Sequence, residues 1–399
     1  MPASDRSTWS ARIEGNPVAR GPQGTFLGVT DRARLQNGTG KAYPGRDSAP
    51  TRRRALEPSG VCSVDTVNLT ASRHVFPVAT FLADHGEPLQ PLFQRAGLPG
   101  TCLDDPKKLV PTAAIWRFRE LAAMRTGSAN LTLTVMAPLA LSDLGAVGQA
   151  LSGAPTLLRT IQDFQRLARS ESSTAILDLT PCHNGDFLFS VQFSLRYQPG
   201  EWQAELCLLM WMLKVVRLVD PNWSPTEIWC YAGGTPDRFR ALESLTARPR
   251  FNQSCTGFPI PASMLALPLQ RCGRRAETEE VLLWSTAPSE STSGAVNQLI
   301  QAYADDRWLT IQEASDALGL HPRALQRRLA AEDKTFSAIL EEARAEVAGR
   351  LLEDTDASVC EIARRVGYSD SSNFNRAFRR WAAVLPSEFR AQRQAEPRP

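Results

Sequence analysis

The chain has 399 residues, of which 43% are hydrophobic, and its formal net charge is +3 at pH 7. This length is enough for two or three ordinary domains with a sizeable buried core. So small a charge excludes a protein that binds nucleic acid through an overall excess of basic residues, and a DNA-binding surface must come from local segregation of charge.

Residues 1–70 are rich in Gly and Pro, and their apolar residues are isolated, without a helical or strand period. Such a segment cannot bury enough apolar surface to offset the entropy lost on ordering. We therefore predict a disordered leader over 1–70, with ordered structure beginning near Val75. An unstructured leader, or a start codon placed too far upstream, accounts for this composition better than a basic arm that contacts DNA.

Residues 75–270 contain both helical and strand patterns. Helical spacing of apolar residues recurs in the stretches 77–98 (a helix pair), 112–125, 143–169 (broken at Pro155) and 201–219. Alternating residues predict two strands, at 175–179 and 187–195, around an Asn184-Gly185 turn. Residues 130–140 are ambiguous, and short strands or turns are expected at 226–231, 249–256 and 264–269. The fold class of this region is therefore an α+β domain, which we interpret as regulatory.

A linker is predicted at 271–292, where the sequence is charged and then rich in Pro, Ser and Thr. The segment 295–391 that follows is almost wholly helical in pattern, and 392–399 form a short tail. The chain thus divides into a leader, an α+β domain, a linker and an all-α domain.

The all-α domain contains an internal repeat. When Gly319 is aligned with Gly367, the segment Ile311–Leu329 matches Cys360–Phe378 in the spacing of small and apolar residues. In each copy an apolar residue precedes the Gly, as expected where a helix ends in a tight turn before a second helix. We predict two helix-turn-helix units, at 311–332 and 359–382.

The second helix of each unit has one apolar face and one polar face when drawn at about 100° per residue. Leu325 and Leu329 face the core in the first unit, and Phe374, Phe378 and Trp381 do so in the second. The opposite faces carry side chains suited to base edges and phosphates. The candidate DNA-binding residues on these faces are Arg323, Gln326, Arg327, Ser372, Arg376, Arg379 and Arg380.

A long amphipathic helix, Thr335 to Glu353, is predicted between the two units. The two units joined by this helix complete the expected fold class, in which an α+β regulatory domain precedes an all-α domain.

At this point the C-terminal segment resembles the AraC/XylS family of transcription regulators. The resemblance covers about 295–391 and rests on LGLHPRALQRRL in the first unit and IARRVGYSDSSNFNRAFRRWAAVLPSEFR in the second. It implies that the second helix of each unit is a DNA-recognition helix. Carried over by position, the candidate DNA-binding residues are Arg323, Gln326 and Arg327 in the first helix, and Ser371, Ser372, Asn373 and Arg376 in the second. Two residues depart from the family pattern: His321 stands where Ser usually caps the first recognition helix, and Ala383 stands where Gly is usual.

The α+β domain resembles the arabinose-binding-like regulatory domain of one AraC-family branch. The stretches that carry this resemblance are 144–169 and 223–269. The label implies no sugar specificity, and no motif in these stretches identifies ligand-binding residues. Five tryptophans in the domain fit core positions better than the lining of an apolar pocket: Trp116, Trp202, Trp211, Trp223 and Trp229.

Catalytic and metal motifs are absent from the sequence. The eight cysteines form no C-x-x-C pair, and we expect idle thiols, no metal site and no cofactor. Cys182 adjoins His183, but adjacent residues of a strand point to opposite faces, so an enzyme fused to a DNA-binding module is disfavoured. The longest apolar run, Leu206–Leu213, is too short to span a bilayer.

The sequence therefore predicts a sequence-specific DNA-binding transcription regulator, not an enzyme, controlled by a small-molecule effector bound to the α+β domain. The alternative is an effector-independent regulator whose α+β domain only dimerises. We expect double-stranded promoter DNA as the partner, in consecutive major grooves, with RNA polymerase as a further partner of an activator. The protein is expected in the cytoplasm, at the nucleoid when bound, with no membrane partner.

Overall fold

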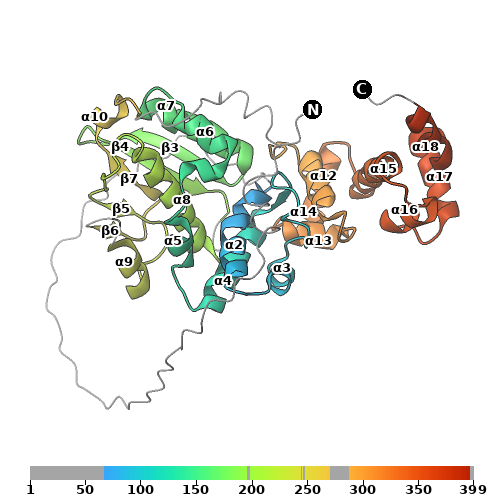
Figure 1. Cartoon of the computed structure of the whole chain (residues 1–399), viewed down its shortest axis with the longest axis horizontal. Helices are drawn as coiled ribbons and strands as arrows, with labels where there is room; N and C mark the ends of the chain where they lie inside the picture. The colour runs from blue at the N-terminus through green and yellow to red at the C-terminus, as the bar shows by residue number, and fades with distance from the viewer. Residues whose placement is uncertain (1–66, 196–197, 244, 246–247, 270–286, 396–399) are drawn as a thin grey trace, which may run out of the picture.

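The computed structural model describes residues 67–195, 198–243, 245, 248–269 and 287–395. Most of the predicted leader, and most of the predicted linker, lie outside these residues. In the described part, an α+β domain leads into a helical segment that extends from one end of it (Figure 1). The expected fold class is confirmed.

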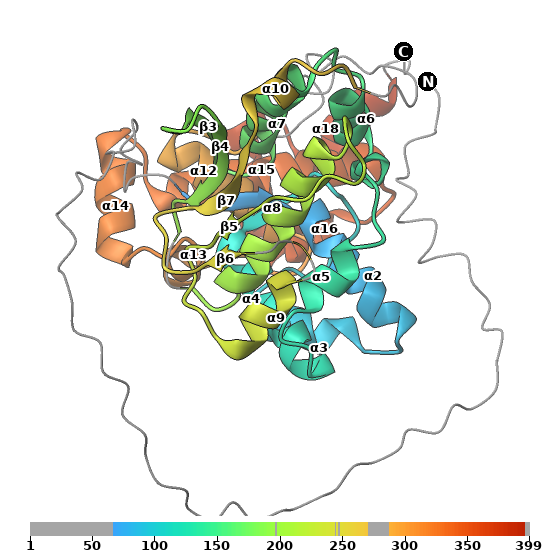
Figure 2. The ribbon, with the colours of Figure 1, turned by 90° about the vertical axis from the view of Figure 1, so that its left-hand side faces the viewer.

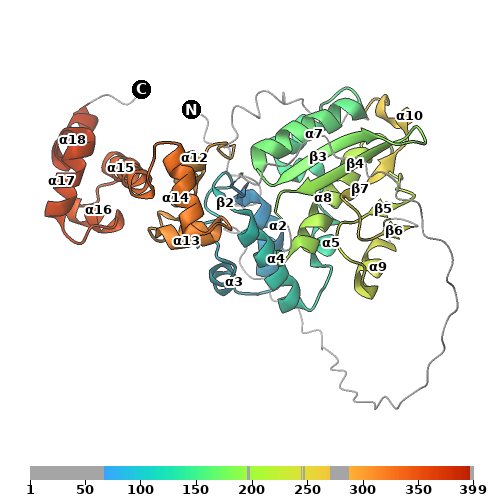
Figure 3. The same cartoon turned by 180° about the vertical axis from the view of Figure 1, so that it is seen from behind.

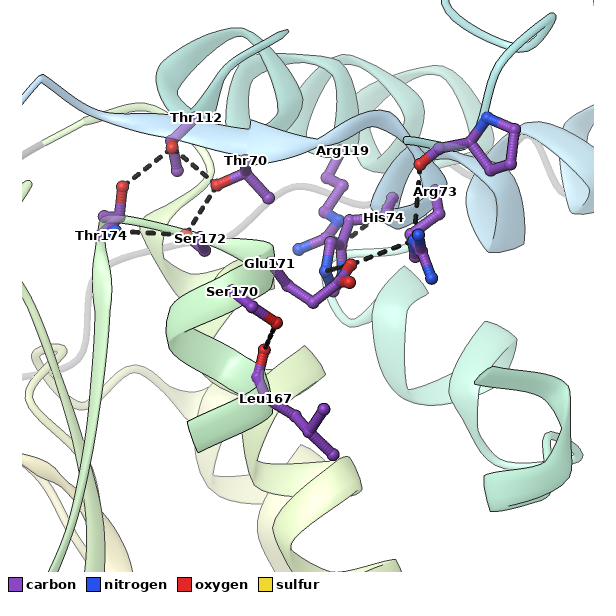
Figure 4. A network of polar contacts seen from close by, with 11 residues as sticks. Thr70, Arg73, His74, Thr112, Arg119, Leu167, Ser170, Glu171, Ser172 and Thr174 are labelled. Carbon is purple, nitrogen blue, oxygen red and sulfur yellow. Dashed lines mark hydrogen bonds and ion pairs between the residues drawn. The ribbon is translucent and has the colours of Figure 1, made fainter. Parts of the chain in front are cut away.

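Ordered structure begins earlier in the chain than the predicted start near Val75. Strand β1 (Leu69–Ala71) pairs antiparallel with β2 (Leu109–Pro111), and Leu69 is fully buried. The hydroxyl of Thr70 lies 2.7 Å from those of Thr112 and Ser172, within the network of polar contacts in Figure 4. A three-residue strand shows no readable period, and its partner lies 40 positions away, so the leader was predicted too long.

The same network continues around a buried carboxylate. Glu171 is 6% exposed, and its Oε2 lies 3.0 Å from Arg73 Nε and 3.6 Å from His74 Nε2. Arg119 donates to the backbone oxygen of His74 at 2.9 Å (Figure 4). Charged groups buried in this way persist only when they are paired, and these contacts fasten the start of the domain to its centre.

The main sheet has the strand order β3-β4-β7-β5-β6. The predicted hairpin is confirmed: β3 and β4 pair antiparallel around Gly185, which has a φ of 86°. The prediction for 264–269 is confirmed in part: residues 264 and 265 end a short helix, but a turn and an isolated β-bridge at Pro268 follow, and the strand of this region lies earlier, at 256–260. The bounds are β3 Ala175–Pro181, β4 Phe187–Phe193, β5 Ile228–Trp229, β6 Pro249–Arg250, β7 Thr256–Ile260 and α10 Ala262–Leu265.

Helices surround this sheet, and α8 lies at the centre of the domain (Figure 3). Of the 16 residues of α8, 13 are buried, because it contacts α4, α5, α7 and β7 together. The ambiguous stretch 130–140 contains α5, and α9 was not predicted. The bounds are η1 Ser72–Val75, α2 Phe76–Asp84, α3 Leu89–Ala96, α4 Thr112–Thr126, α5 Leu131–Met136, η2 Leu141–Leu144, α6 Ala146–Ser152, α7 Leu157–Glu171, α8 Glu201–Val216 and α9 Pro236–Glu243.

The helical segment follows the predicted plan. Two helix-turn-helix units flank the long helix α15, which is capped by Thr335 and ends one residue beyond the predicted Glu353. The bounds are α12 Thr292–Tyr303, α13 Ile311–Ala317, α14 Pro322–Ala331, α15 Phe336–Asp354, α16 Val359–Arg365, α17 Ser371–Ala382 and α18 Pro386–Ala395. Among the described helices, none combines the length and apolar character that a membrane crossing requires.

The two units belong to different hydrophobic cores. The core of the α+β domain continues through α12 into the first unit, where it includes Leu325 and Leu329. The second unit packs in a separate cluster with Ile362, Phe374 and Phe378 at its centre. The first unit therefore shares the core of the α+β domain, while the second packs in its own cluster with the end of α15 and with Ala304 and Trp308 from the segment after α12.

Candidate nucleic-acid interface

The first unit begins with a reciprocal cap. The hydroxyl of Thr310 accepts from the backbone N–H of Glu313 at 3.2 Å, and a Glu313 oxygen accepts from the backbone N–H of Thr310 at 2.8 Å. These hydrogen bonds lower the pKa of Glu313. Helix α13 ends at Ala317, and Gly319 makes the predicted tight turn two residues later, with a φ of 68° in the left-handed region.

The first recognition helix, α14, starts at Pro322, where no N–H partner is needed. His321 does cap it: the ring nitrogen Nδ1 accepts from the backbone N–H of Arg323 at 3.3 Å. Leu325 and Leu329 are fully buried, as predicted. The opposite face is exposed and carries Arg323, Gln326 and Arg327.

The arginines of this face are unconstrained. Within the described residues, neither Arg323 nor Arg327 forms an ion pair, and both are exposed. Figure 2 shows α14 at the periphery of the molecule. Free guanidinium groups at the edge of a protein can form bidentate hydrogen bonds with guanine or with phosphate.

The second unit repeats this construction. Ser358 and Glu361 form the same reciprocal cap as Thr310 and Glu313, and Gly367 makes the turn with a φ of 84°. Asp370 caps α17, since its Oδ1 accepts from the backbone N–H of Asn373 at 2.7 Å. That bond, with others to the same carboxylate, lowers the pKa of Asp370. The preference for Asp before the first helical residue is the signal that could have identified this cap.

An aromatic cluster supports the second recognition helix from below. Phe374 and Phe378 are at most 2% exposed, and their ring centroids lie 5.7 Å apart. Tyr368, Trp381 and Phe389 contact them edge-on or tilted, at centroid distances of 5.4 to 6.4 Å. Trp381 is partly exposed but joins this core as predicted.

The outward face of α17 is more constrained than that of α14. Arg376 Nη2 donates to Asn373 Oδ1 at 2.6 Å, and Asn373 in turn donates to Asp370. Arg380 pairs with Glu341 of α15 at 3.2 Å. Ser372 and Arg379 are exposed, whereas Ser371 is half-buried. The candidate residues of this helix therefore differ in their freedom to turn toward a ligand.

Helix α17 ends in the strained conformation predicted from its sequence. Ala383 has a φ of 61° and a ψ of 0°, which is the left-handed region that glycine occupies without cost.

A stack of side chains joins the two units, and sequence analysis did not predict it. The Arg344 guanidinium lies 5.3 Å from the ring centroid of Trp308 and 5.6 Å from that of Tyr368. Trp308 Nε1 also donates to the backbone oxygen of Arg365 at 2.8 Å. A cation between two rings is attracted to both, so the stack holds α15 against both units.

A second unpredicted set of contacts joins the regulatory domain to the end of α12. The Tyr303 hydroxyl donates to the backbone oxygen of Gly97, and Asp306 accepts from the backbone N–H of Gly100. Lys108 Nζ lies 3.3 Å from Asp305 Oδ2. Tyr303 is 3% exposed, and burial raises the pKa of its hydroxyl. No local period could have found contacts between residues some 200 positions apart.

The environment of Cys182 does not favour nucleophilic catalysis. Burial raises the pKa of its thiol, whereas a reactive cysteine needs a lowered one. In the described ranges, no three His, Cys, Asp or Glu side chains gather as a metal site would require.

Two family models match the chain. A helix-turn-helix domain matches residues 314–392, and the N-terminal arabinose-binding domain of AraC transcription regulators matches residues 86–269. The first match covers the recognition helices α14 and α17, and the second covers most of the α+β domain.

Curated relatives match over different lengths. The ornithine utilization regulator of Pseudomonas aeruginosa is 24% identical over 334 residues, or 82% of this chain and 97% of the relative. An uncharacterized helix-turn-helix regulator of Mycobacterium tuberculosis is 44% identical over 80 residues, 20% of this chain and 23% of the relative. The regulator VirS of the same species is 31% identical over 45% of this chain and 54% of its own length. The chain thus spans about a quarter of the length of the first mycobacterial relative and about half of the length of the second.

Among solved structures, the transcriptional regulator CdpR of Pseudomonas aeruginosa aligns over 79% of this chain and 96% of its own. The TM-score is 0.37 and the sequence identity is 20%.

Proposed function

The chain belongs to the AraC family of DNA-binding transcription regulators, and we propose that it recognises a bipartite DNA site under the control of a small molecule. The observation that carries the DNA part of the proposal is the pair of exposed recognition faces, one at each end of α15.

The spacing of these faces supports two consecutive major grooves. Helix α15 has 19 residues, which corresponds to about 28 Å at about 1.5 Å per residue. Successive major grooves on one face of DNA recur about every 34 Å. Because each recognition helix is displaced sideways from an end of α15, one chain can fill both grooves.

Each face is assigned a role from its chemistry. In the first groove, Arg323, Gln326 and Arg327 contact bases or phosphates. In the second, Ser371, Ser372, Asn373 and Arg376 do so, with Arg379 and Arg380 toward the backbone phosphates. Since the two sets differ, the two half-sites differ in sequence.

The experiment is a footprint of the full chain on its promoter, followed by an insertion of about five base pairs between the half-sites. The insertion turns one half-site to the far side of the duplex by half a helical turn. We expect affinity to fall to that of a single half-site, while the same insertion just outside the footprint leaves it unchanged. Equal affinity for both DNAs contradicts the bipartite arrangement.

Effector control is supported by the continuity between the regulatory domain and the first unit. The core of the domain extends into α14, and Tyr303, Asp305 and Asp306 contact the loop region 97–108. A change of shape in the domain therefore has a direct path to a recognition helix. One relative, which matches over almost its full length, is named an ornithine utilization regulator. That name also fits control by a small-molecule signal.

The alternative remains a domain that only dimerises, with the protein in the cytoplasm and at the nucleoid when bound to DNA. A thermal-shift screen of the full chain against metabolites separates the two, because a ligand that binds only the native state raises the melting temperature. Light scattering reports whether the chain is a dimer. If the protein is an activator, RNA polymerase is the further partner.

A further inference from the structure

The regulatory domain contains a cavity of about 560 Å³ at the N-terminal end of the buried helix α8. This volume falls in the range of about 300–1,000 Å³ that is typical of small-molecule sites. Four parts of the fold converge on it: α4, the start of α8, the loop after β5, and the β6–β7 loop with α9. Its lining includes Glu120, Glu201, Trp202, Tyr231, Arg238 and Gln253.

The charges that line the cavity are mainly negative. Glu120 and Glu201 contribute two carboxylates, both from half-buried side chains. The cation that faces them, Arg238, is already engaged: its Nη1 donates to the backbone oxygen of Gly233 at 2.7 Å, and its guanidinium lies 5.0 Å from the Trp202 ring centroid. Two carboxylates and one guanidinium stand among these lining residues, so the cavity favours a cationic ligand over an anionic one.

A third carboxylate lies behind the cavity. Glu205 is one helical turn after Glu201 and is 1% exposed; it accepts from the Thr256 hydroxyl at 2.6 Å and from the backbone N–H of Ala232 at 3.1 Å. Burial, with the nearby Glu201 carboxylate, raises the pKa of Glu205 to about 7. Glu205 thus anchors the loop that lines the cavity and becomes negative above neutral pH.

We propose that this cavity is the effector site and that it takes a small polar molecule with a protonated amine. The carboxylates of Glu120 and Glu201 accept hydrogen bonds from the ammonium group. The side-chain amides of Asn252 and Gln253 bind the polar remainder of the molecule. This inference rests on the effector control proposed above and gives the effector a location and a chemical class.

The position of Glu120 connects the cavity to the first helix-turn-helix unit. Glu120 lies on α4, and α4 starts at the residue after β2. Strand β2 contacts α12, the helix that ends at Tyr303. A ligand held by Glu120 therefore acts on the element that packs against the DNA-binding segment.

The test uses the full chain and three matched pairs of four- and five-carbon probes: 1,4-diaminobutane and 1,5-diaminopentane, the diols of the same length, and the dicarboxylates of the same length. We expect at least one diamine at millimolar concentration to raise the melting temperature, and calorimetry to show saturable binding. The diols and dicarboxylates should leave the melting temperature unchanged.

Two variants locate the binding. Glu120→Gln and Glu201→Gln each keep the side-chain shape and should weaken diamine binding at least tenfold. Asp84→Asn removes a carboxylate from the exposed end of α2 in the same domain and should bind diamines as the wild type does. Circular dichroism spectra that match the wild type confirm that both cavity variants fold.

The outcomes separate this inference from the proposed function. Stabilisation by neither diamine, or diamine binding that persists in both cavity variants, overturns the amine site. Stabilisation by a dicarboxylate instead overturns the chemical class and leaves effector control standing. Specific promoter binding is measured on the same samples without probe, so a failure of the DNA-binding proposal is seen independently of any ligand.

Discussion

The two helix-turn-helix units share one local plan but differ in what holds them. Each has a reciprocal Ser or Thr cap, a left-handed glycine turn and a recognition helix with a polar outer face. The first packs two leucines onto a core that continues into the regulatory domain, whereas the second has an aromatic cluster of its own. The first unit therefore packs as part of the α+β domain, whereas the second packs in its own cluster together with the end of α15.

The outer faces of the two recognition helices differ in how far neighbouring groups hold their side chains: those of α14 are held less than those of α17. On α14 the guanidinium groups of Arg323 and Arg327 are exposed, and within the described residues neither has an ion-pair partner. On α17 the chain from Arg376 through Asn373 to Asp370 orders the side chains before DNA is met. Under the proposed DNA-binding role, the second unit would meet DNA with pre-ordered side chains, which lowers the entropy lost on binding, whereas the side chains of the first unit would adapt to it.

The largest expected effect on stability comes from truncating one buried side chain in each of the two cores. Phe378→Ala should cost about 3–5 kcal/mol, because it leaves a cavity in the aromatic cluster of the second unit. Leu329→Ala should cost about 2–5 kcal/mol in the core shared with the regulatory domain. Hydrogen exchange read by mass spectrometry should show faster exchange in the end of α15 and in 355–395 for Phe378→Ala, and in both the first unit and the α+β domain for Leu329→Ala.

The comparison breaks if the two substitutions give the same exchange pattern. Equal loosening of every region would mean one cooperative core, and loosening confined to 311–332 in Leu329→Ala would mean that the first unit is independent as well.

The next effect concerns DNA affinity. Arg327→Ala and Arg376→Ala should each weaken specific binding by about 1–3 kcal/mol if the guanidinium reaches a base bidentately, with relaxed specificity at one position. Arg95→Ala removes the same charge from the exposed end of α3 and serves as the control. Promoter affinities of all three variants at one salt concentration give the measurement. Wild-type affinity in both recognition-helix variants would contradict the assignment of these faces.

Arg376→Lys sharpens the contrast between the two faces. Lysine keeps the positive charge but loses the planar fork that reaches Asn373. Arg376→Lys should therefore lose almost as much affinity as Arg376→Ala, whereas Arg327→Lys keeps a phosphate contact if that is the role of Arg327.

Local rules predicted both helix-turn-helix units because their determinants lie within a few residues of each other. Gly319 and Gly367 mark the turns, and Leu325 and Phe374 repeat at helical spacing. His321 forms a cap where Ser is usual in the family, since an imidazole nitrogen can accept the same hydrogen bond as a hydroxyl.

Contacts over long separations could not be predicted in this way. Strand β1 exists because β2 offers it a partner, and its three residues have no pattern of their own. The Tyr303 contact with Gly97 and the stack around Arg344 depend on how complete elements pack. The cavity at α8 could not be predicted from the sequence for the same reason. Trp202 is a core residue, at 6% exposure, and it also lines the cavity.

The smallest expected effect compares the ends of two helices with opposite substitutions. Ala383 is exposed and has a φ of 61°, so Ala383→Gly removes the cost of a left-handed alanine, about 1–2 kcal/mol, partly offset by the greater freedom of glycine in the unfolded chain. We expect a net gain of about 1 kcal/mol or less in the second unit. Gly319 has a φ of 68°, and an added Cβ would meet no atom within 4 Å, so Gly319→Ala introduces only the backbone strain.

The pair isolates backbone strain from packing, because neither substitution changes a buried contact. Ala383→Gly should slow exchange in the second unit alone, since its core is separate, whereas Gly319→Ala should speed exchange in the first unit and, through the shared core, in the regulatory domain. Promoter affinity should be unchanged in Ala383→Gly, as no candidate contact moves. A loss of stability in Ala383→Gly would show that the left-handed end of α17 is not strained. Faster exchange confined to the first unit in Gly319→Ala would contradict the coupling between that unit and the α+β domain.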